Sequence, residues 1–154
     1  MAVLALAFVM GVLNGLRSFT PPAVAAWAAH RNWIKLQGAL SPIRSFPVVA
    51  MFTLLASFEL FADKTPWIPD RTTTMSLVAR GAMGALTGAC VAAAGGRSAV
   101  VGAVCGVAGA IAGAFGGYHA RKRSVQALRV PDIYVALVED LICIGGALWV
   151  VTRF

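Results

Sequence analysis

Six apolar stretches separated by short polar or basic gaps constrain this chain more than any other feature. Only 12% of its 154 residues are charged, about half the share that a soluble domain carries, and its mean hydropathy is +0.80. Backbone polar groups in lipid must be satisfied within the chain, which favours helices. We therefore expect an all-α, polytopic membrane protein with six short transmembrane helices. They are predicted at about residues 2–14, 20–29, 47–62, 75–94, 99–116 and 133–151.

A short motif occurs twice in the chain. Segment 15–18 recurs as segment 95–98 with Gly, Arg and Ser at the same positions, and an acidic residue, Glu59 or Glu139, follows each copy at the same distance. Three helices per copy is an odd number, so the second copy must enter the membrane from the opposite side. The sequence thus predicts one compact membrane domain made of two inverted three-helix repeats. The repeats are residues 1–74, including a linker, and 75–154.

The gaps between the apolar stretches predict how the helices begin and end. The first stretch is too short, at about 1.5 Å per residue, to cross a hydrocarbon core of about 30 Å comfortably. Ser18 or Thr20 is expected to cap the second helix, whose first turn tolerates two prolines. Residues 30–45 are typical of an interfacial connection with Trp33 as an aromatic anchor. Two prolines and paired charges predict a non-helical linker at 63–71.

Residues 119–131 are predicted to form a basic surface loop or an amphipathic turn. Counting basic residues in the gaps, with Arg17 and Arg97 left out, indicates the orientation of the chain. One side holds seven of them, at positions 64, 71, 80, 121, 122, 123 and 129, and the other holds four, at 31, 35, 44 and 153. The positive-inside rule then places both termini outside the cytoplasm of a bacterial plasma membrane. The N-terminal stretch lacks the positive start of a signal peptide, so we expect it to be retained.

Arg17 and Arg97 each fall where a helix begins, beside unpaired N–H groups with partial positive charge. A cation at that position needs a negative group to offset it, either a carboxylate of the protein or a bound anion. Glu59 and Glu139 are the internal candidates because each lies inside an apolar helix, where an unpaired charge costs on the order of 3 kcal/mol. We expect these four residues to form a pseudo-symmetric site for an anionic group. The alternative is that they form ion bridges that only fix the helix register.

Five further residues are secondary candidates. Asp63 and Lys64 form either a second functional cluster or a salt bridge at a helix end. His119 and Arg121 lie in the basic segment, where contact with lipid head groups or simple solvation is expected. Asp140 follows Glu139 but lies about 100° around the helix, so we expect it to face a different neighbour.

A glycine stripe marks the fifth apolar stretch. Its members are spaced by four, three, four and four residues, so they line one helix face: Gly102, Gly106, Gly109, Gly113 and Gly117. Such a face lets another backbone approach closely, within the monomer or across a dimer. The three cysteines, Cys90, Cys105 and Cys143, are widely spaced in apolar helix. They are interpreted as small packing residues, not as a metal site or a disulfide framework.

No enzyme signature is present in the sequence: there is no zinc-binding His spacing, no nucleophile elbow and no phosphate-binding glycine loop after a strand. We therefore expect no metal, no cofactor and no enzymatic activity. A lipid-active enzyme using Asp63, Lys64 and His119 stays open as an alternative. The net charge of +7 lies in gaps between apolar runs, which fits lipid phosphates better than nucleic acid.

Four groups of residues resemble a known family in their order and spacing. They are Gly15-x-Arg17, Glu59-x-x-x-Asp63-Lys64-x-Pro66, Gly117-x-His119 and Glu139-Asp140. This pattern resembles a bacterial family of small integral membrane proteins classed as a domain of unknown function. The resemblance spans most of the chain and implies the membrane architecture, but it implies no activity.

These observations favour a small transporter, channel or lipid-translocating protein whose Arg/Glu site takes an anionic group, with proton linkage through the carboxylates. Its expected partners are membrane lipid and an anionic small molecule or lipid phosphate. The alternative is a non-catalytic membrane subunit or scaffold that packs against a larger complex through its glycine-rich helix. A homodimer is compatible with either function.

Overall fold

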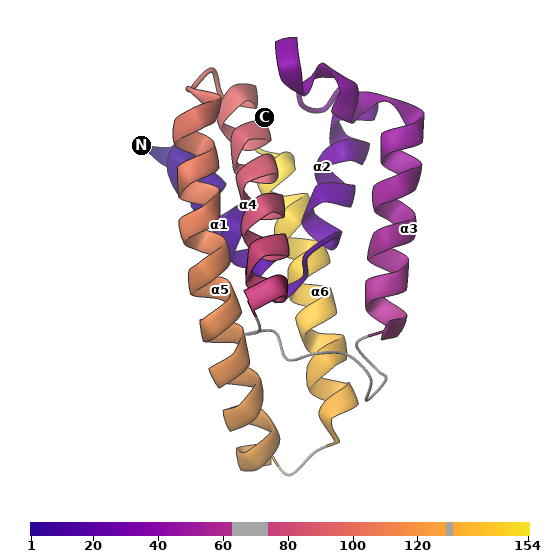
Figure 1. Ribbon diagram of the computed structural model, residues 1–154, viewed down its shortest axis with the longest axis vertical. Helices are drawn as coiled ribbons and strands as arrows, with labels where there is room; N and C mark the ends of the chain where they lie inside the picture. The colour runs from indigo at the N-terminus through magenta and orange to yellow at the C-terminus, as the bar shows by residue number, and fades with distance from the viewer. Residues whose placement is uncertain (63–73, 129–130) are drawn as a thin grey trace.

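The computed structural model describes residues 1–62, 74–128 and 131–154, and this part of the chain is helical, without a strand (Figure 1). The predicted all-α class is therefore confirmed. The elements are α1 (Ala2–Leu16), α2 (Thr20–His30), the 3-10 helix η1 (Gly38–Arg44), α3 (Phe46–Ala62), α4 (Thr74–Ala94), α5 (Ala99–Leu128) and α6 (Asp132–Val151).

The predicted number of six transmembrane helices is wrong. Three helical segments of the described chain are long and apolar enough to cross a membrane, Thr74–Ala94, Ala99–Gln126 and Ile133–Val151. The number rises to four if the helices Gly38–Arg44 and Phe46–Phe61, which meet at an angle of 66°, are counted together as one bent span. At 15 and 11 residues, α1 and α2 are only about 22 and 16 Å long, shorter than the hydrocarbon core.

Helix α1 packs mainly against α4 and α5 and also contacts α2 and α6; its C-terminal half is buried, whereas Phe8 and Val9 are exposed. Small residues allow this arrangement. A Cβ added to Gly11 would collide with the carbonyl group of Gly106, and one added to Gly15 would collide with the backbone of Ala110 and Ala114. The α1 and α5 backbones are therefore in direct contact, and dispersion forces act over their whole shared length.

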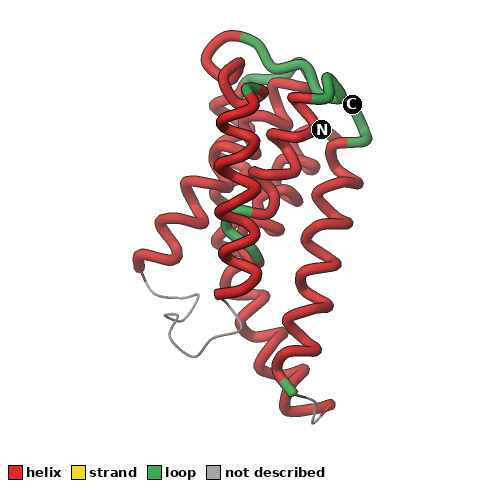
Figure 2. Tube along the Cα trace, turned by 90° about the vertical axis from the view of Figure 1, so that its right-hand side faces the viewer, coloured by secondary structure: helices red, strands yellow, loops and turns green. Residues whose placement is uncertain are grey.

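The chain turns back in the interior of the molecule between α1 and α2. In Figure 2 this connection lies among the helices, whereas the other connections drawn in green lie near the two ends of the molecule. Both termini and the α4–α5 turn lie at one end of the bundle, where Gly95 faces Val3 and Phe154. Helix α2 returns to that same end. Helices α1 and α2 thus form a hairpin that enters the bundle and leaves it on the same side.

Helix α5 is longer than the sequence indicated. It continues to Leu128, so most of the expected basic loop at 119–131 is helical. The pair Gly116 and Gly117 suggested an end, but residues 120–126 are mostly good helix formers, and a glycine inside a helix costs only about 1 kcal/mol. The basic residues Arg121, Lys122 and Arg123 consequently lie on the last turns of α5, at the end of the molecule away from the termini.

Each predicted repeat contains three α-helices, but their lengths differ. Helix α2 has 11 residues, whereas α5, which begins at the matching position, has 30. The inverted repeat and its boundary at residue 74 stay predictions. The expected linker at 63–71 lies outside the described residues.

Candidate functional site

The break between α1 and α2 brings polar groups into the centre of an apolar bundle. Arg17 has extended backbone angles (φ −137°, ψ 122°), which ends α1. Helix α2 begins at Thr20, with prolines in its first turn, where missing N–H groups cost nothing. The side chains of Arg17, Ser18 and Thr20 are buried all the same. When a helix ends and another begins inside a bundle, the backbone N–H and C=O groups at the two helix ends need hydrogen-bond partners.

The expected side-chain cap of α2 is wrong. Its N-cap residue is Phe19, and neither Ser18 nor Thr20 forms a capping hydrogen bond. Instead, the Glu59 carboxylate of α3 accepts hydrogen bonds from the backbone N–H groups of Ser18 (2.6 Å) and Phe19 (2.9 Å). A carboxylate placed there satisfies two N–H donors and interacts favourably with the positive end of the helix dipole.

Arg80 of α4 contacts the other side of the break. Its Nη1 donates a hydrogen bond of 2.7 Å to the carbonyl oxygen of Gly15, and its Nε donates one of 3.1 Å to Ser76 Oγ. This places a guanidinium at the negative, C-terminal end of α1. The two helix ends at the break thus face side chains of opposite charge, a cation at the end of α1 and an anion at the start of α2.

Arg17 itself is 0% exposed and forms a salt bridge with Asp140 of α6. A buried guanidinium requires such a partner, because an uncompensated charge in a medium of low dielectric constant is very costly. The neighbouring acid, Glu139, bonds to Arg121 of α5 at 3.4 Å. Asp140 and Glu139 therefore face different neighbours, as their 100° separation predicts.

These contacts define a charge cluster of three arginines and three acids, Arg17, Arg80, Arg121, Glu59, Glu139 and Asp140. Its formal charges cancel. The Cys143 thiol on α6 lies within electrostatic range of four of them, Arg17, Glu59, Arg80 and Asp140, so these groups share one region of the bundle. Arg17, Arg80, Glu59 and Asp140 lie around the break, and the Arg121–Glu139 pair extends the cluster from α6 to α5.

Further buried polar groups lie on either side of the break. Asn14 Nδ2 donates hydrogen bonds to Met10 O (2.8 Å) and to Thr87 Oγ1 on α4 (2.6 Å). The oxygen Asn14 Oδ1 and the hydroxyl of Thr20 have no hydrogen-bond partner among the described residues. The Cys143 thiol donates to the carbonyl oxygen of Leu13. Cys90 and Cys143 are buried, and all three cysteines are free.

The second predicted arginine does not belong to this cluster. Arg97 is exposed in the α4–α5 turn, at the end of the molecule that holds the termini. The structure therefore contradicts a site in which Arg17 and Arg97 face one shared cavity. Helix length is the physical reason: α4, with 21 residues, ends at the surface, whereas α1 ends inside. Glu59 and Glu139 do lie in the cluster.

The secondary candidates fall in different places. Asp140 and Arg121 are members of the charge cluster, and His119 is exposed on α5, where its ring contacts that of Tyr118 at a centroid distance of 5.5 Å. Asp63 and Lys64 lie outside the described residues. Within the described ranges, no group of three or more His, Cys, Asp or Glu side chains is arranged to hold a metal ion.

Sequence reasoning missed Arg80, which was counted among the loop residues although it is 4% exposed inside α4. The signal was present, because Arg80 is the one charge in the apolar stretch 75–94. An ionisable residue inside such a stretch is a candidate site residue by default.

Four of the five glycines in the α5 stripe are covered by helices of the same chain. Cβ atoms added to Gly102 and Gly106 would collide with the α4 backbone at Gly88 and Gly84. At Gly109 and Gly113 they would collide with the α1 backbone around Phe8 and Val12. A scaffold function would therefore have to use a different face from the one predicted.

Residues 4–152, nearly the whole chain, match the model of a protein family described as a domain of unknown function, DUF4126. The chain belongs to the DUF4126 family. This confirms the predicted membership in a family of unknown function. No curated protein and no solved structure matches the chain. All six residues of the charge cluster lie within the DUF4126 region.

Proposed function

We propose that this protein is a proton-linked membrane transporter or lipid-translocating protein for an anionic group, and that the substrate binds at the α1–α2 break. The observation that supports this is the placement of Glu59 on the N–H groups of Ser18 and Phe19. A helix N-terminus is a favourable site for an anion, and here a carboxylate of the protein occupies it.

Arg17 supports the same proposal, because its guanidinium also faces a carboxylate, that of Asp140. Guanidinium groups bind carboxylates and phosphates through the same donors. An anionic substrate would therefore compete with Glu59 for the helix N-terminus and with Asp140 for Arg17. Protonation of these two acids would remove their charge and favour the exchange, so uptake of the anion would be accompanied by uptake of protons.

The location of the site is consistent with transport. Breaks in membrane-embedded helices are where many secondary transporters bind substrate, because the ends of the half-helices supply unpaired donors and acceptors. Asn14 Oδ1 and the Thr20 hydroxyl lie on the two sides of the break without described partners and would add polar contacts. The competing interpretation is that the cluster only holds the helices in register.

We infer a plasma-membrane location with both termini outside the cytoplasm. Arg80 is buried and Arg97 is exposed at the end that holds the termini, so the sequence count becomes six basic residues against five. Arg121, Lys122 and Arg123 lie at the end of the bundle opposite the termini, where the positive-inside rule places the cytoplasm.

Purified protein in liposomes tests the proposal. Uptake of inorganic phosphate, of small carboxylates and of a fluorescent anionic lipid would be measured with and without an inward proton gradient. We expect a proton gradient to accelerate at least one of these fluxes, and Arg17→Gln to reduce it to the level of empty liposomes. Arg97→Gln is the matched control, because it removes the same charge at the same motif position in an exposed turn, and it should leave the flux unchanged.

Glu59→Gln separates transport from a structural role. Gln keeps an acceptor oxygen for the α2 N-terminus but cannot take up a proton, so a flux that persists in this variant should depend less on the proton gradient, with Asp140 as the remaining acid. If wild type and folded Arg17→Gln gave equal fluxes for every anion, the cluster would be a structural ion bridge and transport at this site would be ruled out.

A further inference from the structure

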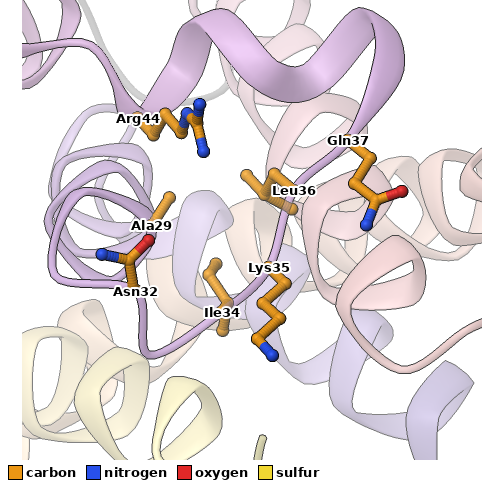
Figure 3. Close-up of a pocket in the computed structure, with 7 residues that line it drawn as sticks. All are labelled: Ala29, Asn32, Ile34, Lys35, Leu36, Gln37 and Arg44. Atoms are coloured by element: carbon orange, nitrogen blue, oxygen red, sulfur yellow. The ribbon is translucent and has the colours of Figure 1, made fainter.

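A second polar site lies at the end of the bundle that carries both termini. It is a cavity of about 210 Å³ formed by the end of α2, the segment that follows it and the end of η1 (Figure 3). Seven residues line it: Ala29, Asn32, Ile34, Lys35, Leu36, Gln37 and Arg44. None of them belongs to the charge cluster.

The cavity has an apolar floor with a guanidinium beside it. In Figure 3 the side chains of Ala29, Ile34, Leu36 and Arg44 surround one space, while Lys35 and Gln37 extend outward at its rim. Ala29, Ile34 and Leu36 are at most 4% exposed, so the floor is part of the packed core. Ile34 and Leu36 thus face the core, whereas Lys35 and Gln37, which alternate with them, are exposed.

Hydrogen bonds hold the walls in place. Asn32 has a left-handed backbone (φ 59°), which Asn tolerates better than most residues, and it reverses the chain after α2. The N–H group of Trp33 then donates to Ala28 O at 2.8 Å. On the other wall, His30 Nδ1 donates to the carbonyl oxygen of Arg44 at 2.9 Å, which ties η1 to α2.

The charge of the lining is entirely positive. Lys35 and Arg44 are cations, and Asn32 and Gln37 offer amide donors. No Asp or Glu occurs before residue 59, and neither cation forms an ion pair with a carboxylate of the described residues. Arg44 faces the cavity and Lys35 extends from its rim, and guanidinium and ammonium groups both bind the acceptor oxygens of a phosphate group.

The surroundings of the cavity are typical of a membrane interface. Trp33 is 52% exposed, and Phe46 at the start of α3 is 64% exposed. The His30 ring contacts the rings of Trp27 and Phe46 at centroid distances of 5.9 and 6.3 Å. Aromatic side chains of this kind gather at the level of lipid head groups. The exposed apolar side chains Met51 and Leu54 continue along α3 from there.

We propose that this cavity binds a phosphate group, with the Arg44 guanidinium as its principal ligand and the Lys35 ammonium, on a flexible side chain at the rim, as the second. The group is either the phosphodiester of an anionic phospholipid, whose acyl chains would lie along α3, or a soluble phosphate. The proposal shares no residue with the charge cluster and holds whether or not the protein transports an anion.

The test compares two double variants that remove equal charge from the same end of the molecule. Lys35→Gln/Arg44→Gln alters the cavity. Arg31→Gln/Arg97→Gln is the control, because Arg97 is exposed and Arg31 lies over the Trp27 ring at 5.8 Å, outside the cavity lining. Binding of phosphatidylglycerol, with phosphatidylcholine as reference, would be measured by native mass spectrometry, and binding of inorganic phosphate by calorimetry in detergent. Both variants should elute and melt like wild type, since all four side chains are exposed.

We expect the cavity variant to bind the phosphate ligand about tenfold more weakly and the control to bind within about twofold of wild type. Selective loss of phosphatidylglycerol, with no competition by millimolar phosphate, identifies a lipid head group. Selective loss of inorganic phosphate binding identifies a soluble phosphate. Equal losses in both double variants would show general surface electrostatics and overturn the proposal, as would binding that neither variant affects.

Discussion

The two copies of the Gly-x-Arg-Ser motif have nearly the same residues and opposite environments. In the first copy, Arg17 is fully buried between the end of α1 and the start of α2 and pairs with Asp140. In the second, Arg97 is exposed in a turn at one end, and its backbone N–H closes that turn on Ala92 O at 2.8 Å. The difference lies in the preceding helix, since α1 has 15 residues and α4 has 21. A motif does not determine its own depth; the length of helix before it does.

The largest expected difference between the copies is in stability. Arg17→Gln removes one member of the buried Arg17–Asp140 ion pair, and breaking such a pair typically costs about 3 to 5 kcal/mol. Arg97→Gln changes an exposed side chain and should alter the free energy of unfolding by less than about 0.5 kcal/mol. Chemical denaturation in detergent measures both. Adding Asp140→Asn to Arg17→Gln should recover part of the loss, and equal stability of the two single variants would contradict the buried pair.

The second largest difference in stability is expected between substitutions of the two motif glycines, Gly15 and Gly95. Gly15→Ala would force a Cβ against the backbone of Ala110 and Ala114 on α5, which cannot move aside locally, so a cost of about 1 to 3 kcal/mol is expected. A Cβ at Gly95 would meet the side chains of Val3 and Phe154, which can shift. Gly95→Ala should therefore cost clearly less in the same denaturation measurement. A reversed order would show that α1 and α5 are not in direct contact.

Replacing Glu59 is expected to cause a loss of stability of intermediate size, and it affects only the first copy of the motif. Glu59→Ala removes the acceptor for two N–H groups at the start of α2 and should cost about 1 to 2 kcal/mol, as loss of a helix cap does. Hydrogen exchange at the amides of Ser18 and Phe19 should accelerate, while exchange in the middle of α5 should not. Unchanged protection of these two amides would mean that Glu59 does not cap α2. Glu59→Gln, which keeps an acceptor, serves as the milder comparison.

The smallest effect is expected at the serines of the motif. Ser18→Ala and Ser98→Ala should each change the free energy of unfolding by less than about 0.5 kcal/mol. Ser18 looks like a helix cap by sequence, but the carboxylate of Glu59 takes that role, and α2 has no side-chain cap of its own. Thermal melting of the two variants checks this. A loss above 1 kcal/mol in Ser18→Ala alone would mean that its hydroxyl does cap α2.

Local sequence signals predicted the helices well and their membrane-spanning role less well. The ends of α4 and α6 were correct to one residue, because turn-forming or polar residues bound long apolar stretches there. The end of α5 was wrong, because Gly116 and Gly117 were interpreted as a terminator although helix formers follow. The predicted number of six membrane-spanning helices was wrong because α1 and α2 are short and form a hairpin. Composition alone does not show whether a short apolar helix crosses the membrane.

The candidate site was predicted in part. Arg17, Glu59 and Glu139 stood out as charges in apolar surroundings, and Asp140 was a secondary candidate. Their pairing was not predictable, because Asp140 lies 123 residues from Arg17 in the chain, and which helices are neighbours depends on the packing of the whole bundle. Arg80 was overlooked because a cation six residues into α4 looks like a loop residue when membrane depth is judged from sequence alone.

The sequence by itself determined that this chain is helical and apolar, where most of its helices begin and end, and that it contains a few costly charges. Only the tertiary structure decided which motif copy is buried, which acid offsets which arginine, and that the glycine stripe of α5 packs against α1 and α4. The reason is physical: helix formation depends on neighbouring residues and their solvent, whereas compensation of a buried charge depends on groups that packing brings together from distant parts of the chain.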